Sequence, residues 1–376
     1  MRIEPFGVEL WMNEFETTCD YNLAETCVDS LTLEELLALA DTTPGQLMSE
    51  LLPMRLSYGE IIGSERLRTA IAALYETKTA AQVIVAHGAI GANALVHHGL
   101  VEADDRVISL VPNYQQHYSI PESIGADVVR IPLRPENDYL VDLDELAAAA
   151  TPGTKLIALS NPNNPTGSLM DREMLAEVAA IAERCGAYVL SDEVYRGLDQ
   201  DGDGSTVSMA DLYERGISTG SMSKAFSLAG LRLGWVAGPA DVLELVSTHR
   251  DYNTISVGMV DDRLAALALE HAEPILSRSR TITRRNLALL SPWVDDEPLL
   301  SWVRPSSGTT GIVHYDLPLP ARDFCVQLLD ETGVMFTPGS VMGMDGSVRV
   351  GFANDTAVLT AGLERVSAFL AARATT

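Results

Sequence analysis

The stretch KLIALSNPNNPTG, residues 155–167, joins a continuous apolar run to a loop that contains three asparagines and two prolines. An apolar run without alternation is typical of a strand that is buried on both faces of a parallel sheet. The loop residues favour turns, so a plain turn is one interpretation of the amides. A helical segment at 172–186 and a second apolar run, AYVLS at 187–191, follow. This order predicts a strand–helix–strand unit.

The same alternation extends outward from this unit in both directions. Apolar runs at 83–86, 106–112 and 127–133 precede segments of helical period, and two further strand candidates follow at 217–223 and 231–239. This order predicts an α/β fold with a mostly parallel central sheet and helices on both faces. Ligands of such sheets bind beyond the carboxyl ends of the strands, so the residues after each run are the candidates for chemistry.

The pattern changes after about residue 280, where we expect a long helix, short strands at 311–317, 334–339 and 347–353, and a final helix. This order is typical of a smaller α+β domain. We therefore expect an N-terminal segment and flap at 1–42 that belongs to the small domain, a large domain at 43–285, and a small C-terminal domain at 286–376.

The charge and the cysteines restrict the class of protein. Twenty-six Lys and Arg against 52 Asp and Glu give a net charge of -26, which disfavours binding to nucleic acid or to an anionic membrane. The four cysteines form no C-x-x-C pair, as expected in a reducing cytoplasm. The N-terminal residues lack the apolar region of a signal peptide, and no run approaches the length of a membrane span.

Polar residues follow several of the predicted strands. Asn161 to Gly167 follow one strand, Asp192 and Tyr195 follow the next, and Ser221, Ser223 and Lys224 follow a third, with Arg232 eight residues after the lysine. An enzyme that uses pyridoxal phosphate needs a lysine for the aldehyde, a carboxylate for the pyridine nitrogen, and donors for the phenolic oxygen and the phosphate. The sequence offers each of these groups at one sheet edge.

The motifs SNPNNPTG, SDEVYRGL, SMSKAFSLAGLRLGW and VRVGF, in this order, resemble the class I/II aminotransferases, which are fold type I pyridoxal-phosphate enzymes. The resemblance implies that residues 43–285 bind the cofactor and that Lys224 holds it as a Schiff base and moves the α-proton. It also implies that Asp192 pairs with the pyridinium nitrogen, while Tyr195 and Asn164 donate to the phenolic oxygen. Asn161 and Asn163 are then expected to form the turn.

For the phosphate, the resemblance implies Ser221, Ser223, Arg232 and the backbone of Gly88, Ala89 and Ile90 at the start of a helix. Many relatives carry a hydroxyl or amide after the glycine, whereas Ala89 and Ile90 can offer their backbone alone. The start of a helix favours anions because its N–H groups are unpaired. Residues 88–94 also partly match a dinucleotide fingerprint, but the first G-x-G spacing is missing.

The resemblance implies three further roles. Tyr114 would stack on the cofactor ring, and Tyr58 would reach the phosphate of a neighbouring subunit, which implies a homodimer with shared active sites. Arg349 would bind the substrate carboxylate with its planar guanidinium. His87 and His117 also follow predicted strands, and whether they contact the ring or the substrate stays open.

We therefore expect an aminotransferase that acts on an amino acid and a 2-oxo acid. The alternative is an oxidation, cyclisation, elimination or racemisation of a cationic, arginine-like amino acid, because the same residues can serve these reactions. Glu25 would then favour a cationic side chain, whereas Glu14 and Glu16 are expected on a solvated helix face. A pyridoxal-phosphate-binding regulator is disfavoured, because the sequence shows no basic N-terminal extension.

The acidic segment DQDGDG at 199–204 begins like a calcium-binding loop. Its twelfth position is Ala210 rather than glutamate, and the seven histidines show no metal-ligand spacing. We predict a solvated turn there and no metal site.

Overall fold

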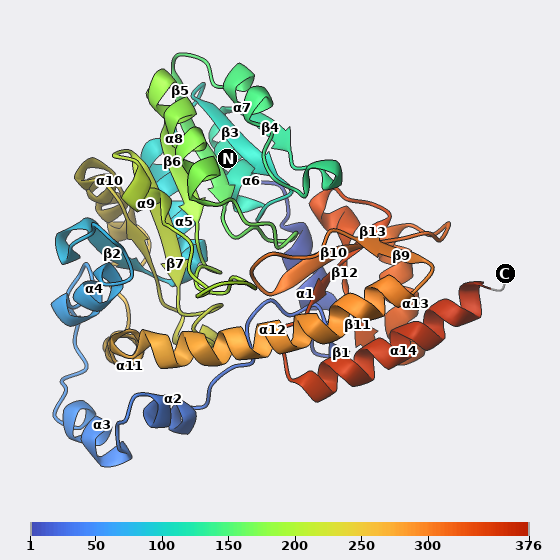
Figure 1. Cartoon of the computed structure of the whole chain (residues 1–376). Helices are drawn as coiled ribbons and strands as arrows, with labels where there is room; N and C mark the ends of the chain where they lie inside the picture. Colours follow the sequence, from blue (N-terminus) through green and yellow to red (C-terminus); the bar gives the residue numbers. More distant parts are fainter. Residues whose placement is uncertain (1, 375–376) are drawn as a thin grey trace.

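The structure, a computed structural model, describes residues 2–374 and contains a seven-stranded central sheet (Figure 1). The strands, in their order across the sheet, are β2 (Val83–Ala86), β8 (Gly234–Ala237), β7 (Gly216–Ser221), β6 (Tyr188–Asp192), β5 (Thr154–Ser160), β3 (Arg106–Val111) and β4 (Asp127–Pro132). β8 runs antiparallel to both of its neighbours, and all other pairs are parallel. The predicted mostly parallel sheet is confirmed.

Helices cover both faces of this sheet because successive strand residues point to opposite sides. Leu156 packs in a cluster with α5 and α10, whereas its neighbour Ile157 packs in a cluster with α8. The helices of this part are α4 (Glu65–Ala72), α5 (Gly88–Leu100), α6 (Gln116–Ile124), α7 (Leu143–Ala149), α8 (Arg172–Cys185), α9 (Met209–Leu212), α10 (Ala240–Asp251) and α11 (Met259–Glu270). The buried runs that suggested parallel strands therefore form a core on each face.

A smaller α+β part lies at the other end of the molecule (Figure 1). Its antiparallel sheet has the order β12 (Thr337–Pro338), β13 (Ser347–Gly351), β10 (Thr310–Tyr315), β9 (Leu300–Trp302). Helices α13 (Ala321–Thr332) and α14 (Thr356–Ala374) pack on it. The N-terminal α1 (Gly7–Phe15) joins this core through Trp11, and β1 (Tyr21–Asn22) pairs with β11 (Val334–Met335). The smaller α+β part expected from the sequence is confirmed.

One long helix, α12 (Ala272–Asp296), connects the two parts. The predicted boundary between residues 285 and 286 falls inside this continuous helix and stays a prediction. Helices α2 (Leu33–Leu39) and α3 (Pro44–Leu51) each begin with a Thr capping box, and both pack against α11. Within residues 2–374, no helix is long and apolar enough to cross a membrane.

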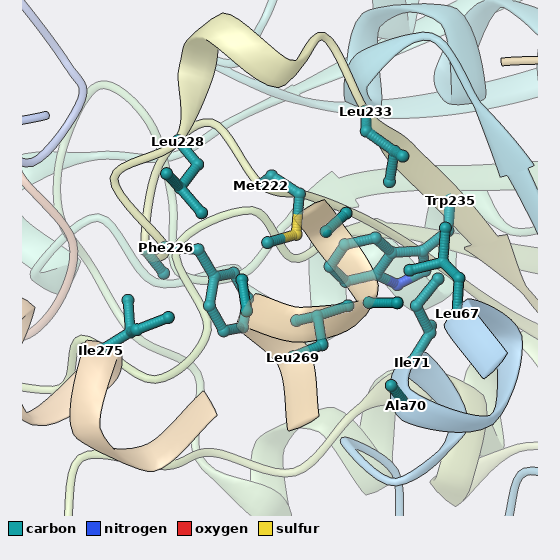
Figure 2. Packing of buried hydrophobic residues seen from close by; sticks show 14 of the residues in the cluster. Leu67, Ala70, Ile71, Met222, Phe226, Leu228, Leu233, Trp235, Leu269 and Ile275 are labelled. Carbon is teal, nitrogen blue, oxygen red and sulfur yellow. The ribbon is translucent and has the colours of Figure 1, made fainter. Parts of the chain in front are cut away.

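A hydrophobic core anchors the segment that follows β7 (Figure 2). Met222, Phe226 and Leu228 point into this core, where Trp235 of β8, Ile71 of α4 and Leu269 of α11 surround them. Burial of such side chains contributes about 1.5–3 kcal/mol each. Lys224 lies between these anchors, so the core fixes the backbone that presents its amine.

Candidate active site

A cavity of about 320 Å³ lies beyond the carboxyl ends of the central strands. It gathers most of the residues that the sequence predicted for the site. Its lining includes Glu25, Gly88, Ala89, Ile90, Tyr114, Asn164, Asp192, Tyr195, Ser221, Ser223, Lys224, Arg232 and Arg349. Tyr58 is absent from this lining and is considered below.

Lys224 projects into the cavity from the loop after β7. Its Nζ donates to Thr26 Oγ1 at 2.6 Å and to Cys27 Sγ at 3.4 Å. Burial lowers the pKa of Lys224, but negative charge on Cys27, Tyr195 and Glu25 outweighs it and leaves the pKa raised. The N-terminal segment therefore holds the amine in place.

Asp192 is the last residue of β6 and is buried at the cavity wall. Its Oδ2 accepts a hydrogen bond from Asn93 Nδ2 at 2.7 Å, and its Oδ1 accepts one from the backbone N–H of Val194 at 3.2 Å. His117 Nε2 lies 3.7 Å from Oδ2. The two hydrogen bonds fix the orientation of this carboxylate.

The hydroxyl of Tyr195 is buried and makes no hydrogen bond of ordinary geometry within the described residues. Asn164 accepts from Arg349 Nη1 through its Oδ1 at 3.2 Å, which leaves its amide N–H groups free for a ligand. Arg349 is buried on β13, and burial lowers its pKa. Its Nη2 donates to Ala24 O and Thr337 Oγ1, while its Nε has no partner among residues 2–374. Unpaired buried donors of this kind are rare, so a ligand is expected to satisfy them.

The three asparagines of the loop after β5 have two different roles. Asn161 exchanges two hydrogen bonds with the backbone of Met170, and Asn163 accepts from Thr166 and donates to Pro112 O. Both side chains therefore brace the loop, as expected for turn-forming residues. Asn164 lines the cavity, so the loop's many amides serve to hold one of them toward a ligand.

The end of the cavity at the start of α5 carries groups that suit an anion. Helix α5 begins at Gly88, and the first hydrogen bond of the helix runs from Gly91 N–H to His87 O, which leaves the preceding N–H groups available. A Cβ on Gly88, whose φ is +63°, would lie 3.3 Å from Arg232 Nη2, so the glycine lets the arginine approach. Ser221 and Ser223 supply hydroxyls beside this helix start.

Tyr114 lies on the opposite wall, where the N-terminal segment covers it. Its hydroxyl donates to Glu9 Oε1 at 2.9 Å, and Phe6 packs edge-on against its ring with 4.7 Å between centroids. Burial and the neighbouring Glu9 raise the pKa of Tyr114. Helix α1 therefore reaches the cavity through Glu9.

Glu25 lines the cavity and also caps its own turn. Its Oε1 accepts from the backbone N–H groups of Thr26 at 2.6 Å and Cys27 at 2.7 Å. Burial raises the pKa of Glu25, but Lys224 and these N–H groups outweigh it, so the pKa is lowered. A Cβ on Gly351 would lie 2.0 Å from Glu25 O, so this glycine lets the N-terminal segment cross β13 into the site.

The position of Glu16 differs from the one expected from the sequence. The sequence placed Glu14 and Glu16 on a solvated helix face, and Glu14 does lie outside, paired with Arg322 at 2.8 Å. Glu16 instead follows the end of α1 and lines the exposed mouth of the cavity. Burial, Glu25 and Glu9 raise its pKa. Glu16 is the C-cap of α1, with helical backbone angles, and its exposed side chain lies near the acids of the cavity.

Three predicted residues lie outside the cavity lining. Tyr58 is 75% exposed between α3 and α4. His87 precedes α5, and His117 is buried on α6 beside Asp192. His117 therefore lies beside Asp192 and does not line the cavity.

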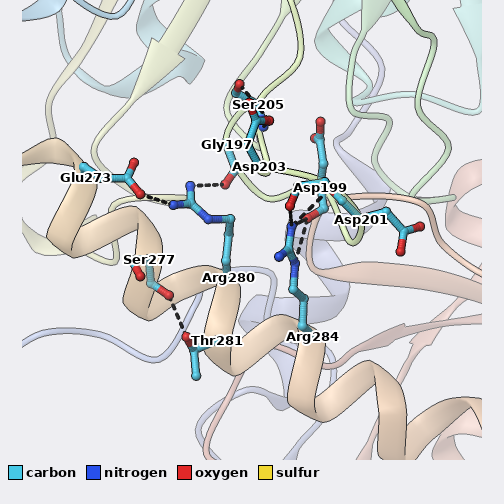
Figure 3. Close-up of polar contacts among 11 residues, drawn as sticks. Gly197, Asp199, Asp201, Asp203, Ser205, Glu273, Ser277, Arg280, Thr281 and Arg284 are labelled. Carbon is cyan, nitrogen blue, oxygen red and sulfur yellow. Dashed lines mark hydrogen bonds and ion pairs between the residues drawn. The ribbon is translucent and has the colours of Figure 1, made fainter.

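The acidic loop at 199–204 is organised by arginine (Figure 3). Arg284 of α12 donates to the backbone carbonyls of Asp199, Asp201 and Gly202 at 2.7–3.1 Å. The Asp199 carboxylate is buried and accepts from Ser307 Oγ at 2.9 Å. Hydrogen bonds from Arg284 to backbone carbonyls therefore fix the path of this loop.

Sequence reasoning missed several residues of the cavity: Glu9, Thr26, Cys27 and Asn93. The first three come from the N-terminal segment, whose path cannot be read from local patterns. Asn93 did carry a signal. It lies four residues before His97 in a helix whose one other polar side chain is His98, so Asn93 and His97 share one helix face.

These groups suit pyridoxal phosphate chemically. Within the described residues, the cavity presents the amine of Lys224, the anchored carboxylate of Asp192, donors without a partner at Tyr195 and Asn164, and the N–H groups that begin α5. These match the aldehyde, ring nitrogen, phenolic oxygen and phosphate of that cofactor. The buried guanidinium of Arg349 remains available for a substrate carboxylate.

Comparison with known proteins agrees with this arrangement. The sequence profile of the aminotransferase class I and II family matches residues 31–366. The chain is 31% identical to capreomycidine synthase of Streptomyces vinaceus over 96% of this chain and 92% of that protein. It is 34% identical to the arginine–pyruvate transaminase AruH of Pseudomonas aeruginosa, over 78% and 77%. A solved pyridoxal-phosphate-dependent aminotransferase from Streptococcus suis is 43% identical, with a TM-score of 0.96 and 99% of each chain covered.

Proposed function

The chain belongs to the class I and II aminotransferase family and is a pyridoxal-phosphate enzyme of the aminotransferase type, and from this we propose that Lys224 is its catalytic lysine. The observation that carries the proposal is the meeting of Lys224, Asp192 and Arg349 in one cavity. When bound, pyridoxal phosphate withdraws electrons from the substrate α-carbon and so makes its proton removable.

The residues of the large sheet would hold the cofactor. Asp192 would face the ring nitrogen, and the free donors of Tyr195 and Asn164 would face the phenolic oxygen. Ser221, Ser223, Arg232 and the N–H groups that begin α5 would bind the phosphate. Lys224 Nζ would attach to the aldehyde as a Schiff base.

Lys224 would also move the proton of the substrate α-carbon. Thr26 Oγ1 and Cys27 Sγ orient its Nζ from the N-terminal side. Tyr114 would pack on the ring, held there by Phe6 and Glu9. The covering segment would limit the access of water to the transferred proton.

We assign the substrate carboxylate to Arg349, whose Nε has no partner within residues 2–374 and whose position is fixed by three hydrogen bonds. The same cavity lining contains three carboxylates, Glu9, Glu16 and Glu25. An acidic wall favours a cationic side chain on the amino acid. We therefore propose an arginine-like or ornithine-like substrate, with a 2-oxo acid as amino acceptor.

A second candidate reaction is cyclisation, elimination, oxidation or racemisation of the same cationic amino acid. Two observations favour keeping it: the acidic wall, and the similarity to a protein named as a synthase rather than a transaminase. The residues around Lys224 serve all these reactions after the first proton is removed.

We further propose a homodimer with shared sites. Tyr58 stands in an exposed apolar stretch with Leu52, Leu56 and Ile61, and a second copy would bury this surface and receive Tyr58 at its phosphate site. We also propose a cytoplasmic location, which the four free thiols within residues 2–374 support.

The test is to incubate the pure protein with a panel of amino acids while its cofactor spectrum is recorded and products are identified by mass. Arginine, ornithine or a hydroxylated relative should change the spectrum at lower concentration than aspartate or glutamate. A 2-oxo acid product with transfer of nitrogen to pyruvate indicates transamination, and a cyclic or dehydrated product indicates the second candidate. A clear preference for aspartate or glutamate would contradict the proposed substrate class.

A further inference from the structure

Asp192 is held from behind the cavity by residues of two helices. Asn93 of α5 donates to its Oδ2 at 2.7 Å, and His117 of α6 lies 3.7 Å from the same oxygen. Both side chains are fully buried. Buried polar side chains therefore contact the carboxylate on the side away from the proposed cofactor.

The amide of Asn93 has one orientation that satisfies its surroundings. Thr219 of β7 donates from Oγ1 to Asn93 Oδ1 at 2.6 Å. The reverse orientation would turn the amide oxygen toward the Asp192 carboxylate, where two acceptors would repel each other. Thr219 therefore directs the N–H of Asn93 to Asp192.

A second polar arm consists of two histidines. His97 Nε2 lies 3.3 Å from His117 Nδ1, and both rings are fully buried. Burial, followed by the neighbouring His117, holds the pKa of His97 well below its usual value, so the ring is neutral. If His97 Nε2 carries the proton, it donates to His117, whose own proton then sits on Nε2 beside Asp192.

The opposite tautomer is unfavourable. It would place a His117 lone pair against the carboxylate oxygen and leave a buried N–H of His97 Nδ1 without a partner among the described residues. Within residues 2–374, the favoured arrangement leaves His97 Nδ1 as an unpaired acceptor, which costs less than an unpaired N–H at that atom. Asn93 thus donates a hydrogen bond to Asp192 Oδ2, and His117 presents its Nε2–H to the same oxygen at 3.7 Å, beyond hydrogen-bond distance.

We propose that Asn93, oriented by Thr219, and the His97–His117 pair are positioning residues that hold the Asp192 carboxylate in place, aimed at the ring nitrogen of the cofactor. The inference rests on the proposed role of Asp192 as partner of that nitrogen. Asn93 makes the shorter contact with Asp192, so we expect it to contribute more than His117 to positioning the carboxylate. The two arms come from α5 and α6, which pack against each other, so the support is part of the fold.

The test uses the holoprotein loaded with cofactor labelled with nitrogen-15 in its ring, whose magnetic resonance signal reports protonation of that nitrogen. Asn93→Leu should move the signal toward the unprotonated value and raise the dissociation constant of the cofactor about tenfold, because a charge-assisted hydrogen bond is lost. His97→Leu should move the signal in the same direction by less.

Matched variants separate positioning from general damage. Thr219→Val removes the orienting hydroxyl at nearly constant volume and should shift the signal, whereas Thr219→Ser keeps the hydroxyl and should retain the wild-type signal. His98→Leu changes the adjacent histidine, which points to another face of α5, and should have no effect.

Two outcomes are distinguishable. If Asp192→Asn shifts the nitrogen signal but Asn93→Leu and Thr219→Val leave it unchanged, the positioning proposal is overturned and the role of Asp192 stands. If Asp192→Asn also leaves the signal unchanged, the proposed partner of the ring nitrogen is itself wrong.

Discussion

The two walls of the cavity are built in different ways. On the cofactor wall, Asp192, Ser221 and Lys224 stand at or directly after the ends of neighbouring strands, so one sheet aligns them. The substrate wall combines Glu9, Glu16 and Glu25 from the N-terminal segment with Arg349 from the small sheet. Under the proposed assignment, the cofactor chemistry would depend on the rigid sheet, whereas substrate selection would depend on a segment packed across it.

This division predicts that variants on the substrate wall change specificity while cofactor binding stays intact. The largest effect should come from Arg349→Lys, which keeps the charge but loses the planar fork. We expect the specificity constant for the best amino acid to fall on the order of a hundredfold. Steady-state kinetics measure this, and the cofactor spectrum is the internal control. An unchanged specificity constant would mean that the carboxylate is bound elsewhere.

Glu25→Gln should give a smaller and more selective effect. Removing one charge from the acidic wall is expected to lower the specificity constant for arginine by roughly tenfold and to leave that for norleucine unchanged. Glu14→Gln is the matched control, because Glu14 lies in the same segment but pairs with Arg322 outside the cavity. Equal losses for arginine and norleucine would indicate that Glu25 only caps its turn.

The cofactor wall was largely predictable from the sequence, and the substrate wall was not. The positions of Asp192, Tyr195 and Lys224 follow from apolar runs whose strand ends must meet in a parallel sheet. Cys27 reaches the cavity because Gly351 lets the N-terminal segment pass over β13 at Glu25, a contact between residues more than 300 positions apart. No local pattern encodes such a contact.

The fold shows the same limit. The sequence predicted both strand candidates near β7 and β8, but not that β8 runs antiparallel between β7 and β2. Periodicity identifies a strand, whereas its direction depends on the connection and its partners. The sequence shows a polar Asn93 in a mostly apolar helix, but only the structure shows that its side chain contacts Asp192 and Thr219.

Tyr58 would add a third component to the active site, because the proposed homodimer brings it from the second subunit. Lys224→Ala and Tyr58→Phe subunits, each of low activity, should complement each other when mixed. At equal amounts about half of the dimers are mixed, and one site of each is intact, so about a quarter of wild-type activity should return. Subunits must exchange before the assay, which labelled protein can verify. Absence of recovery at every mixing ratio would argue against shared sites.

The pH dependence should show which acid on the substrate wall selects the cation. Burial raises the pKa of Glu25, but Lys224 and two backbone N–H groups lower it overall, so its charge persists below the usual range and is lost only in stronger acid. The pKa of Glu16 is raised by burial and by its acidic neighbours. The preference for arginine over norleucine should therefore stay constant from neutral pH to about pH 5. A preference that fades above that range would assign selection to Glu16.

The most direct test of the central claim is to locate the lysine that attaches to the cofactor. The chain has three lysines, Lys78, Lys155 and Lys224, and the last of these lines the cavity. Borohydride reduction of the holoprotein, proteolysis and mass analysis of the peptides would identify the modified residue. The account predicts the cofactor mass on Lys224. The cofactor mass on Lys78 or Lys155, with Lys224 unmodified, would contradict it.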